Sequence, residues 1–307
     1  MRGADAGNQK AVLVTGSSTG IGRKITVKLA GEGFLVYAGA RKDKDIDALN
    51  KIDNVKAVRL DVTIQEEIDQ AVKLVESGGS GLYAVVNNAG VLGLGSLIEA
   101  EESELDFIFD VNIYGPYRIT KAFAPMIIES KGRVVNISSI SGVLSSELAG
   151  IYSMSKHAVE AYTDSLDQQL RPLGARAIAI EPGTYDSKIF NNLCARLPSS
   201  AKQASGSLVA EKMKEIAGEC DDLPDGESPN NRFPQPDRVA DAVYHALSAT
   251  NPKEHYMVVP TREEARLTIA KAIEELVSLN EDNEFTYSRD ELIEALDEEL
   301  ASRSLVN

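Results

Sequence analysis

The sequence of 307 residues contains no tryptophan and has only three histidines and two cysteines. The histidines, His157, His245 and His255, are too scattered along the chain to indicate a metal site. Cys194 and Cys220 do not make a disulfide framework or a metal site, which favours a reducing compartment. We therefore expect no metal centre and predict a cytoplasmic protein.

Long apolar runs and an excess of positive charge are also missing. No stretch approaches the roughly 18 consecutive apolar residues of a membrane span, and the amino-terminal MRGADAGNQK lacks the apolar centre of a signal peptide. The formal net charge of −15 argues against nucleic-acid binding through a basic face. What remains is a globular chain whose 43% hydrophobic residues suffice for a sizeable core.

Short apolar segments alternate with helical patterns along most of the chain. Near-continuous apolar strands separated by helices are typical of a parallel sheet that is buried on both faces. We therefore predict an α/β fold, a doubly wound Rossmann sheet flanked by helices, in a single domain over residues 1–260. The expected strands cover residues 11–15, 34–39, 55–60, 82–86, 133–138, 176–180 and 255–259, and the first expected helix covers 21–31.

A long insertion separates the last two expected strands. Its centre at residues 218–237 is rich in turn-forming residues, so we expect an irregular surface loop there. Loops of this length in compact domains are usually functional lids or mobile segments.

Residues 261–307 form an acidic C-terminal helical extension. They hold 13 of the 47 acidic residues and 5 of the 32 basic residues, a net charge of −8. TREE at 261–264 and SRDE at 288–291 match the capping-box pattern that begins a helix. The pattern leaves open a flap over an active site, a contact with another subunit, or a hairpin packed on the domain's own flank. A helical apolar stripe follows the second box at Leu292, Ile293, Leu296 and Leu300.

A glycine-rich stretch, VTGSSTGIGRK at 14–24, lies between the first expected strand and the first expected helix. Gly16, Gly20 and Gly22 follow a G-x-x-x-G-x-G spacing. Glycines permit a sharp turn and a close approach of phosphate to the backbone, and the following helix offers free N–H groups and a positive dipole end. The dinucleotide fingerprint G-x-G-x-x-G is spaced differently, but the mechanism is the same. We predict a dinucleotide-binding loop, with a tight strand–helix connection as the alternative.

Tyr152 and Lys156 lie four positions apart on an expected helix, so that their side chains share one face. A nearby cation favours the ionised form of a phenol and lowers its pKa, which is ordinarily about 10. The pair therefore predicts a proton donor and acceptor that works near neutral pH. The alternative is that both residues lie on the helix surface without a joint chemical role.

Several motifs together resemble the short-chain dehydrogenase/reductase family, in the branch that holds retinol, hydroxysteroid and 3-hydroxybutyrate dehydrogenases. The resemblance runs from about residue 10 to 260. It rests on Thr15-Gly16-x-x-x-Gly20-x-Gly22, NNAG at 87–90, Asn112, Ser139, Tyr152-x-x-x-Lys156, and PG at 182–183 with Ser187 following.

The resemblance implies an NAD(P)(H)-dependent oxidoreductase that interconverts a carbonyl and a secondary alcohol. In that family a tyrosine is the acid/base, a lysine lowers its pKa and holds the nicotinamide ribose, a serine bonds the reacting oxygen, and an asparagine completes a proton relay through water. Family spacing selects Ser139 rather than Ser138 or Ser141, which we expect to satisfy backbone groups at the strand end. The implied catalytic residues are Asn112, Ser139, Tyr152 and Lys156.

The residues after the second expected strand bear on the choice of cofactor. Dinucleotide folds that prefer NAD commonly carry Asp or Glu there, whereas an arginine accommodates a 2′-phosphate. By family alignment Ala40 takes the acidic position and Arg41 comes next, with Lys42 and Lys44 adding positive charge. We therefore predict that NADP(H) is preferred over NAD(H); the alternative is that these cations cap a helix or face water. The implied cofactor contacts are Gly16, Ser18, Gly20, Ile21, Gly22, Arg41, Asp61 (on adenine), Val62, Asn88 (beside the adenosine ribose), Ala89, Gly90, Tyr152, Lys156, Pro182, Gly183 and Ser187.

The family also places a substrate loop at about 184–236. Apolar residues there and after NNAG predict a pocket for a lipophilic carbonyl or alcohol, or else the packing of the loop's own helices. Tyr185 stands where the family usually has an aliphatic residue. The apolar residues are Leu92, Leu94, Ile189, Phe190, Leu193, Leu197, Leu208 and Met213.

Family members commonly form dimers or tetramers, so the resemblance implies a homodimer or homotetramer with a small-molecule substrate, no nucleic-acid partner and no membrane span. An alternative from another class is a non-catalytic dinucleotide-binding sensor or scaffold whose acidic tail binds a partner. The four intact catalytic positions argue against it, because a sensor needs no proton relay.

Overall fold

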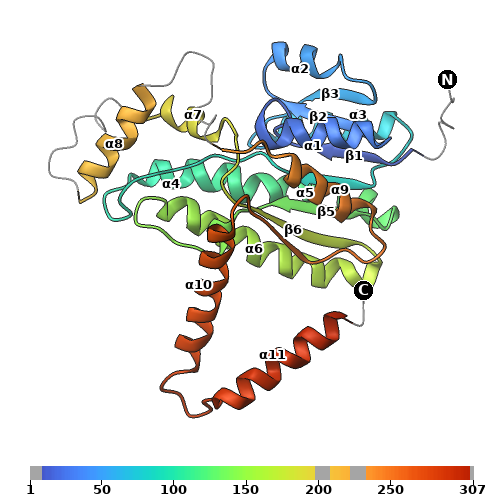
Figure 1. Cartoon of the computed structure of the whole chain (residues 1–307). Helices are drawn as coiled ribbons and strands as arrows, with labels where there is room; N and C mark the ends of the chain where they lie inside the picture. Colours follow the sequence, from blue (N-terminus) through green and yellow to red (C-terminus); the bar gives the residue numbers. More distant parts are fainter. Residues whose placement is uncertain (1–8, 198–207, 222–232, 305–307) are drawn as a thin grey trace.

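Seven parallel strands form one sheet among the residues that the structure describes, 9–197, 208–221 and 233–304 (Figure 1). The computed structural model orders them β3-β2-β1-β4-β5-β6-β7, and the order reverses between β1 and β4. This confirms the predicted doubly wound fold, and every predicted strand overlaps an observed one. The strands are β1 (Ala11–Val14), β2 (Leu35–Ala40), β3 (Val55–Arg59), β4 (Ala84–Asn87), β5 (Arg133–Ile137), β6 (Arg176–Pro182) and β7 (His255–Val258).

Helices cover both faces of the sheet. Alternate side chains of a strand point to opposite faces, so Val12 and Val14 of β1 pack into one core with α1, α2 and α9, while Ala11 and Leu13 pack into another with α3, α5 and α6. Burial on both sides is why the strands are near-continuous apolar runs. These helices are α1 (Gly20–Gly31), α2 (Asp43–Leu49), α3 (Gln65–Ser77), α5 (Gly115–Glu129), α6 (Gly150–Leu170) and α9 (Asp237–Ser248); shorter pieces are α4 (Glu102–Phe109), the π-helical turn η1 (Asp110–Tyr114) and the 3-10 turns η2 (Ile140–Gly142) and η3 (Arg171–Leu173).

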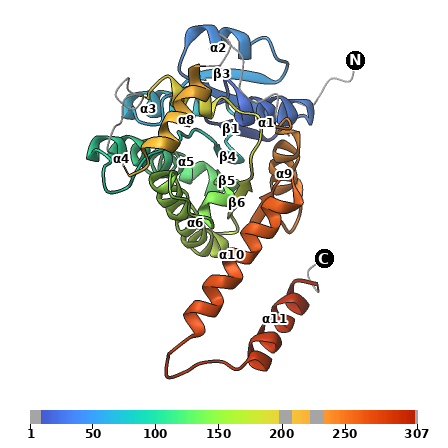
Figure 2. The ribbon, with the colours of Figure 1, turned by 60° about the vertical axis from the view of Figure 1, so that its left-hand side comes forward.

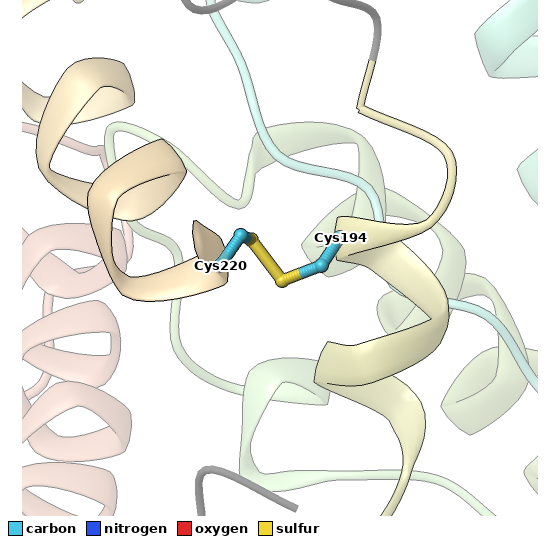
Figure 3. Close-up of a disulfide and its surroundings, with 2 residues drawn as sticks. All are labelled: Cys194 and Cys220. Carbon is cyan, nitrogen blue, oxygen red and sulfur yellow. A yellow bond between two sulfur atoms is a disulfide. The ribbon is translucent and has the colours of Figure 1, made fainter. Parts of the chain in front are cut away.

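A disulfide between Cys194 and Cys220 joins α7 (Ile189–Cys194) to α8 (Ala210–Asp221) (Figure 3). The two cysteines were expected to make neither a disulfide framework nor a metal site, and the structure corrects the first part, because they pair with each other. They are 26 positions apart, but the helices bring their Cα atoms to 5.4 Å, and only the packing of α7 beside α8 decides that distance. The cysteines no longer favour a reducing compartment, so the cytoplasmic location stays a prediction without that argument.

The predicted loop at 218–237 is shorter than expected. Residues 218–221 belong to the last turn of α8, and Asp237 already begins α9. Most of the remaining segment, like residues 198–207 of the expected substrate loop, lies outside the described residues.

Two C-terminal helices, α10 (Arg262–Asn280) and α11 (Arg289–Ser304), project away from the sheet and its flanking helices (Figures 1 and 2). Leu296 and Leu300 in the predicted stripe are each 58% exposed. A hairpin packed on the domain's flank would bury them, so that interpretation is wrong. A flap over the active site, a contact with another subunit and a domain division near residue 260 stay predictions.

Across the described part of the chain, no helix has the length and apolar content needed to cross a membrane.

His255, the first residue of β7, lies within a cluster of carboxylates. Its Nδ1 is 3.3 Å from a Glu160 oxygen and 2.9 Å from a Glu181 oxygen, and its Nε2 is 2.9 Å from Asp164. The contacts with Glu160 and Glu181 raise the pKa of His255 to about 11, although burial lowers it. Glu160, Glu181 and His255 bring potential ligand atoms within 4.8 Å of one another, and His157 and His245 are not part of this group. A protonated imidazole accounts for this grouping and ties β7 to β6 and α6.

The cluster predicts a pH-dependent stability. The folded-state pKa of His255 lies above its ordinary value of 6.5, so the stabilisation is fully present below about pH 6.5 and is lost as the pH rises towards 11. The stability advantage of the wild type over His255→Gln should therefore shrink between pH 6 and pH 10 in urea unfolding. As a control, His157→Gln, whose imidazole contacts the Ser153 carbonyl, should follow the wild-type profile. A pH-independent difference between wild type and His255→Gln would contradict the assignment.

Candidate active site

A cleft of about 530 Å³ lies along the carboxyl edge of the sheet. Carboxyl ends of parallel strands meet at this edge, and the strand order reverses there between β1 and β4. All the predicted site residues except Asn112 line the cleft: Gly16, Ser18, Gly20, Ile21, Gly22, Arg41, Asp61, Val62, Asn88, Ala89, Gly90, Ser139, Tyr152, Lys156, Pro182, Gly183 and Ser187.

The glycine loop after β1 is held against the end of β4. Gly16 and Gly20 adopt φ values of +66° and +53°, which favour glycine. A side chain on Gly22 would bring its Cβ to 2.3 Å from both the Asn88 amide nitrogen and the Gly16 carbonyl. The Asn88 amide donates to the Thr15 carbonyl at 2.8 Å. The loop therefore needs its glycines to pack on the NNAG segment.

The N-terminus of α1 faces the cleft with its backbone donors available. Gly20, Ile21 and Gly22, its first three residues, line the cleft, and the N-cap Thr19 forms no side-chain capping bond within the described residues. Free N–H groups and the positive dipole end at such a terminus favour a phosphate. The loop and helix thus fit the pyrophosphate of a dinucleotide.

Arg41 and Asp61 lie together beyond β2 and β3. The Arg41 guanidinium is 3.5 Å from the Asp61 carboxylate and its side chain is 66% exposed. The other Asp61 oxygen accepts hydrogen bonds from the Thr63 backbone and hydroxyl at 3.0 and 2.8 Å. This end of the cleft therefore has an exposed arginine side chain beside an aspartate that two hydrogen bonds hold in place.

Of the three serines after β5, Ser138 and Ser139 line the cleft, and Ser139 is the one that contacts Tyr152. Its hydroxyl donates to the Pro182 carbonyl at 3.4 Å and accepts from the Ser141 N–H at 3.1 Å. It also forms a hydrogen bond with Tyr152. The expectation that Ser138 satisfies backbone groups is wrong for its hydroxyl, which is buried without a hydrogen-bond partner among the described residues.

Burial governs the acidity of Tyr152 and Lys156. It raises the pKa of Tyr152 to about 12, while the Ser139 hydrogen bond acts in the opposite direction. It also lowers the pKa of Lys156 to about 8, against the charge of Glu160. The Lys156 amine lies 5.6 Å from the centre of the Tyr152 ring and donates to the Ile137 carbonyl at 2.9 Å. The two side chains meet as predicted, but the expected lowering of the phenol pKa is not found, because desolvation of the phenolate dominates.

Asn112 lies behind the cleft, in the π-helical turn η1. Its amide oxygen accepts from the Val91 N–H at 2.8 Å, and its amide nitrogen donates to the Val91 carbonyl at 2.9 Å and to Ser155 at 3.0 Å. The side chain therefore joins η1, the segment after β4 and α6. Such π-helical turns occur frequently at functional sites. The proton relay through Asn112 stays a prediction.

Sequence reasoning missed several residues that shape the site. Thr15 Oγ1 accepts from the N–H groups of Asn88 and Ala89, both at 3.0 Å. Thr15 stands in the glycine motif, which was the available signal. Ser155 and the Ile137 carbonyl gave no sequence signal, because their roles depend on where α6 lies.

The apolar residues expected to form a substrate pocket do not lie together. Leu208 is 69% exposed, and Leu94 and Leu197 are partly buried outside the cleft wall. Leu92, Ile189 and Phe190 line the cleft. Leu193 and Met213 are buried between α7 and α8 instead, as the alternative of helix packing predicted. The cleft therefore has a smaller apolar end than expected.

The comparisons with known proteins agree with this geometry. A family profile described as short chain dehydrogenase matches residues 10–197. The chain is 34% identical over 275 residues to the mitochondrial D-beta-hydroxybutyrate dehydrogenase of Bos taurus, covering 82% of this chain and 77% of that protein. A short-chain dehydrogenase from Streptomyces avermitilis has a TM-score of 0.71 at 26% identity, with 89% and 96% of the two chains covered. A variant of actinorhodin polyketide ketoreductase solved with NADPH has a TM-score of 0.66 at 25% identity, with 81% and 95% covered. The chain therefore belongs to the short-chain dehydrogenase family, and its class is oxidoreductase.

Gly22→Ala tests the phosphate-binding loop. Because the new Cβ would meet Asn88 and the Gly16 carbonyl, the loop must shift, and NADPH affinity should fall by about tenfold or more. Fluorescence titration with NADPH measures the loss.

Gly31→Ala on the same helix is the matched control, since no atom lies within 4 Å of its new Cβ. It should leave binding unchanged and stabilise the helix by up to about 1 kcal/mol. Equal binding by both variants would show that the loop does not hold the cofactor.

Proposed function

We propose that this family member uses NADP(H) to interconvert a lipophilic carbonyl compound and its secondary alcohol. The observation that carries the proposal is that Ser139, Tyr152 and Lys156 come together at one end of a cleft whose other end fits a dinucleotide. The bound nicotinamide supplies or accepts the hydride, and this chain positions the reactants and handles the proton.

Tyr152 is the proposed acid and base. Its pKa of about 12 keeps the phenol protonated at neutral pH, ready to give its proton to the oxygen that becomes negative during carbonyl reduction. Ser139 stabilises the same oxygen with its hydroxyl. Alcohol oxidation needs the phenolate, so it should be favoured at higher pH.

Lys156 is proposed to hold the nicotinamide ribose. Its buried amine lies at the cleft between the Ile137 carbonyl and the Tyr152 ring. Its pKa of about 8 leaves it largely protonated at neutral pH. The charge then favours negative charge on neighbouring oxygens, and we propose that Asn112 completes the proton path.

The NADP(H) preference is supported by Arg41. It follows β2 in the cleft wall, with Ala40 in place of an acid, and an exposed guanidinium suits a 2′-phosphate. The related ketoreductase was solved with NADPH. The negative charge of Asp61 partly offsets the positive charge of Arg41. We therefore propose NAD(H) as a second cofactor that binds the same site less strongly.

The substrate proposal rests on the cleft wall and on one relative. Leu92, Ile189, Phe190 and Phe233 line the cleft, which favours an apolar portion in the substrate. The bovine relative is named for D-beta-hydroxybutyrate, a secondary alcohol. We propose a secondary alcohol with an apolar portion, handled by a homodimer or homotetramer in the cytoplasm.

Tyr152→Phe tests the proposed reaction. With NADPH and a panel of carbonyl compounds, NADPH oxidation should fall by about 100-fold or more, because the general acid is gone, while NADPH binding stays unchanged. Absorbance at the NADPH band and fluorescence titration measure the two quantities.

Tyr162→Phe, on the same helix, is the control and should keep its turnover. Turnover that survives Tyr152→Phe would remove Tyr152 from its role. Tight NADPH binding by the wild type without turnover of any compound would favour the sensor or scaffold alternative.

Arg41→Asp tests the cofactor choice. The carboxylate should repel a 2′-phosphate and accept from a ribose hydroxyl, so the ratio of NADPH to NADH affinity should fall by about tenfold or more. Lys44, which the sequence grouped with the phosphate-binding cations, lies on α2 outside the cleft wall. Lys44→Asp should therefore leave the ratio near the wild-type value. An unchanged ratio in Arg41→Asp would remove the argument for NADP(H).

A further inference from the structure

Glu264, in the first turn of α10, contacts the segment that follows β6. Its Oε1 accepts a hydrogen bond from the Thr184 N–H at 3.0 Å. Thr184 lies between Gly183 and Tyr185, and all three residues line the cleft. The helix belongs to the C-terminal extension, outside residues 10–197 that the family profile matches. The contact therefore joins the extension to a wall of the proposed cofactor site.

The two capping boxes of the extension are built differently. In α11 the box is complete, because Ser288 N–H donates to Glu291 at 2.7 Å and Glu291 N–H donates to Ser288 at 3.3 Å. In α10 only half of it forms: Glu264 N–H donates to the Thr261 hydroxyl at 3.2 Å. The Glu264 carboxylate turns to Thr184 instead of completing its own helix start. Helix capping alone does not account for this side chain.

The second Glu264 oxygen lies against Gly183. Oε2 is buried without a hydrogen-bond partner among the described residues, and a Cβ on Gly183 would approach it to 2.7 Å. Glycine at this position is therefore what lets the carboxylate reach the backbone. A buried carboxylate oxygen without a partner costs free energy, so the contact is made at the expense of stability.

The charge of Glu264 also affects the pKa of Tyr185. Burial raises the pKa of the Tyr185 phenol, Arg238 acts in the opposite direction, and Glu264 adds to the rise. The Tyr185 side chain is 4% exposed and packs into the core beneath the cleft. Residues 183–185 are thus held by the core on one side and by Glu264 on the other.

The segment begins beside the proposed catalytic residues, because the Pro182 carbonyl accepts from Ser139 at 3.4 Å. We propose that Glu264 is a positioning residue that holds the backbone of residues 183–185 in the shape required by the nicotinamide half of the cofactor. This inference rests on the proposed function, because it assigns a role within the same cleft. Glu264 itself is outside the described cleft wall, so it acts through Thr184. A segment ordered before binding loses less conformational freedom when the cofactor enters.

Two ligands separate this role from a general loss of structure. NADPH occupies the whole cofactor site, whereas adenosine 2′,5′-bisphosphate occupies only the adenosine half beside Arg41. Glu264→Ala should weaken NADPH by about tenfold, the usual size of a lost charge-assisted hydrogen bond, and leave the bisphosphate unchanged. Glu264→Gln keeps an acceptor oxygen for the Thr184 N–H and should restore most of the NADPH affinity. Fluorescence titration measures NADPH binding and calorimetry measures the bisphosphate.

Glu291→Ala is the matched control, because it breaks the complete capping box of α11 and should leave both affinities unchanged. Unchanged NADPH affinity in Glu264→Ala, or equal weakening of both ligands, would overturn the positioning role while leaving the proposed function intact. A wild-type chain that binds neither NADPH nor NADH would instead overturn the proposed function, and this inference with it.

Discussion

One buried ammonium group holds together the end of the cleft where Ser139, Tyr152 and Lys156 meet. Lys156 is 6% exposed, and its amine donates to the carbonyl of Ile137, the last residue of β5. A buried charge without partners is costly, so this contact keeps α6 in one position against the sheet. Tyr152 lies one turn earlier on α6, and Ser139 lies two residues beyond β5. The distance between phenol and serine therefore follows from where the ammonium is held.

At Tyr152 and at His255, burial and neighbouring polar groups shift the pKa in different ways, and a different one of the two dominates at each residue. At Tyr152 burial outweighs the hydrogen bond with Ser139, and the pKa rises. At His255 the contacts with Glu160 and Glu181 outweigh burial, and the pKa also rises. The difference arises because His255 has carboxylate oxygens at hydrogen-bond distance, whereas the Lys156 amine is turned towards a backbone carbonyl. A charge must lie close to a buried group to offset its desolvation.

Motif residues and strands were predictable because each is specified by a short stretch of chain. A sheet that is buried on both faces is enough to explain the apolar runs of β1 to β7. A tight turn between strand and helix is enough to explain the glycines at 16, 20 and 22. Residues whose roles depend on distant partners were not predictable. Cys194 and Cys220 pair only because α7 packs beside α8. The Glu264 carboxylate stands in a recognisable capping-box motif but accepts a hydrogen bond from Thr184 instead. Thr184 is 80 positions away in the sequence, so no local pattern predicts that contact.

The sequence by itself determined the doubly wound fold, the resemblance to the short-chain dehydrogenase family and the motif residues that line part of the cleft, because periodicity, glycine spacing and the Tyr-x-x-x-Lys pair are local patterns. The tertiary structure alone decided the acidity of Tyr152, the cysteine pairing and the contact of the C-terminal extension with residues 183–185. Each of these depends on distances and on exclusion of water between segments far apart in the chain, and such quantities exist only once the chain is folded.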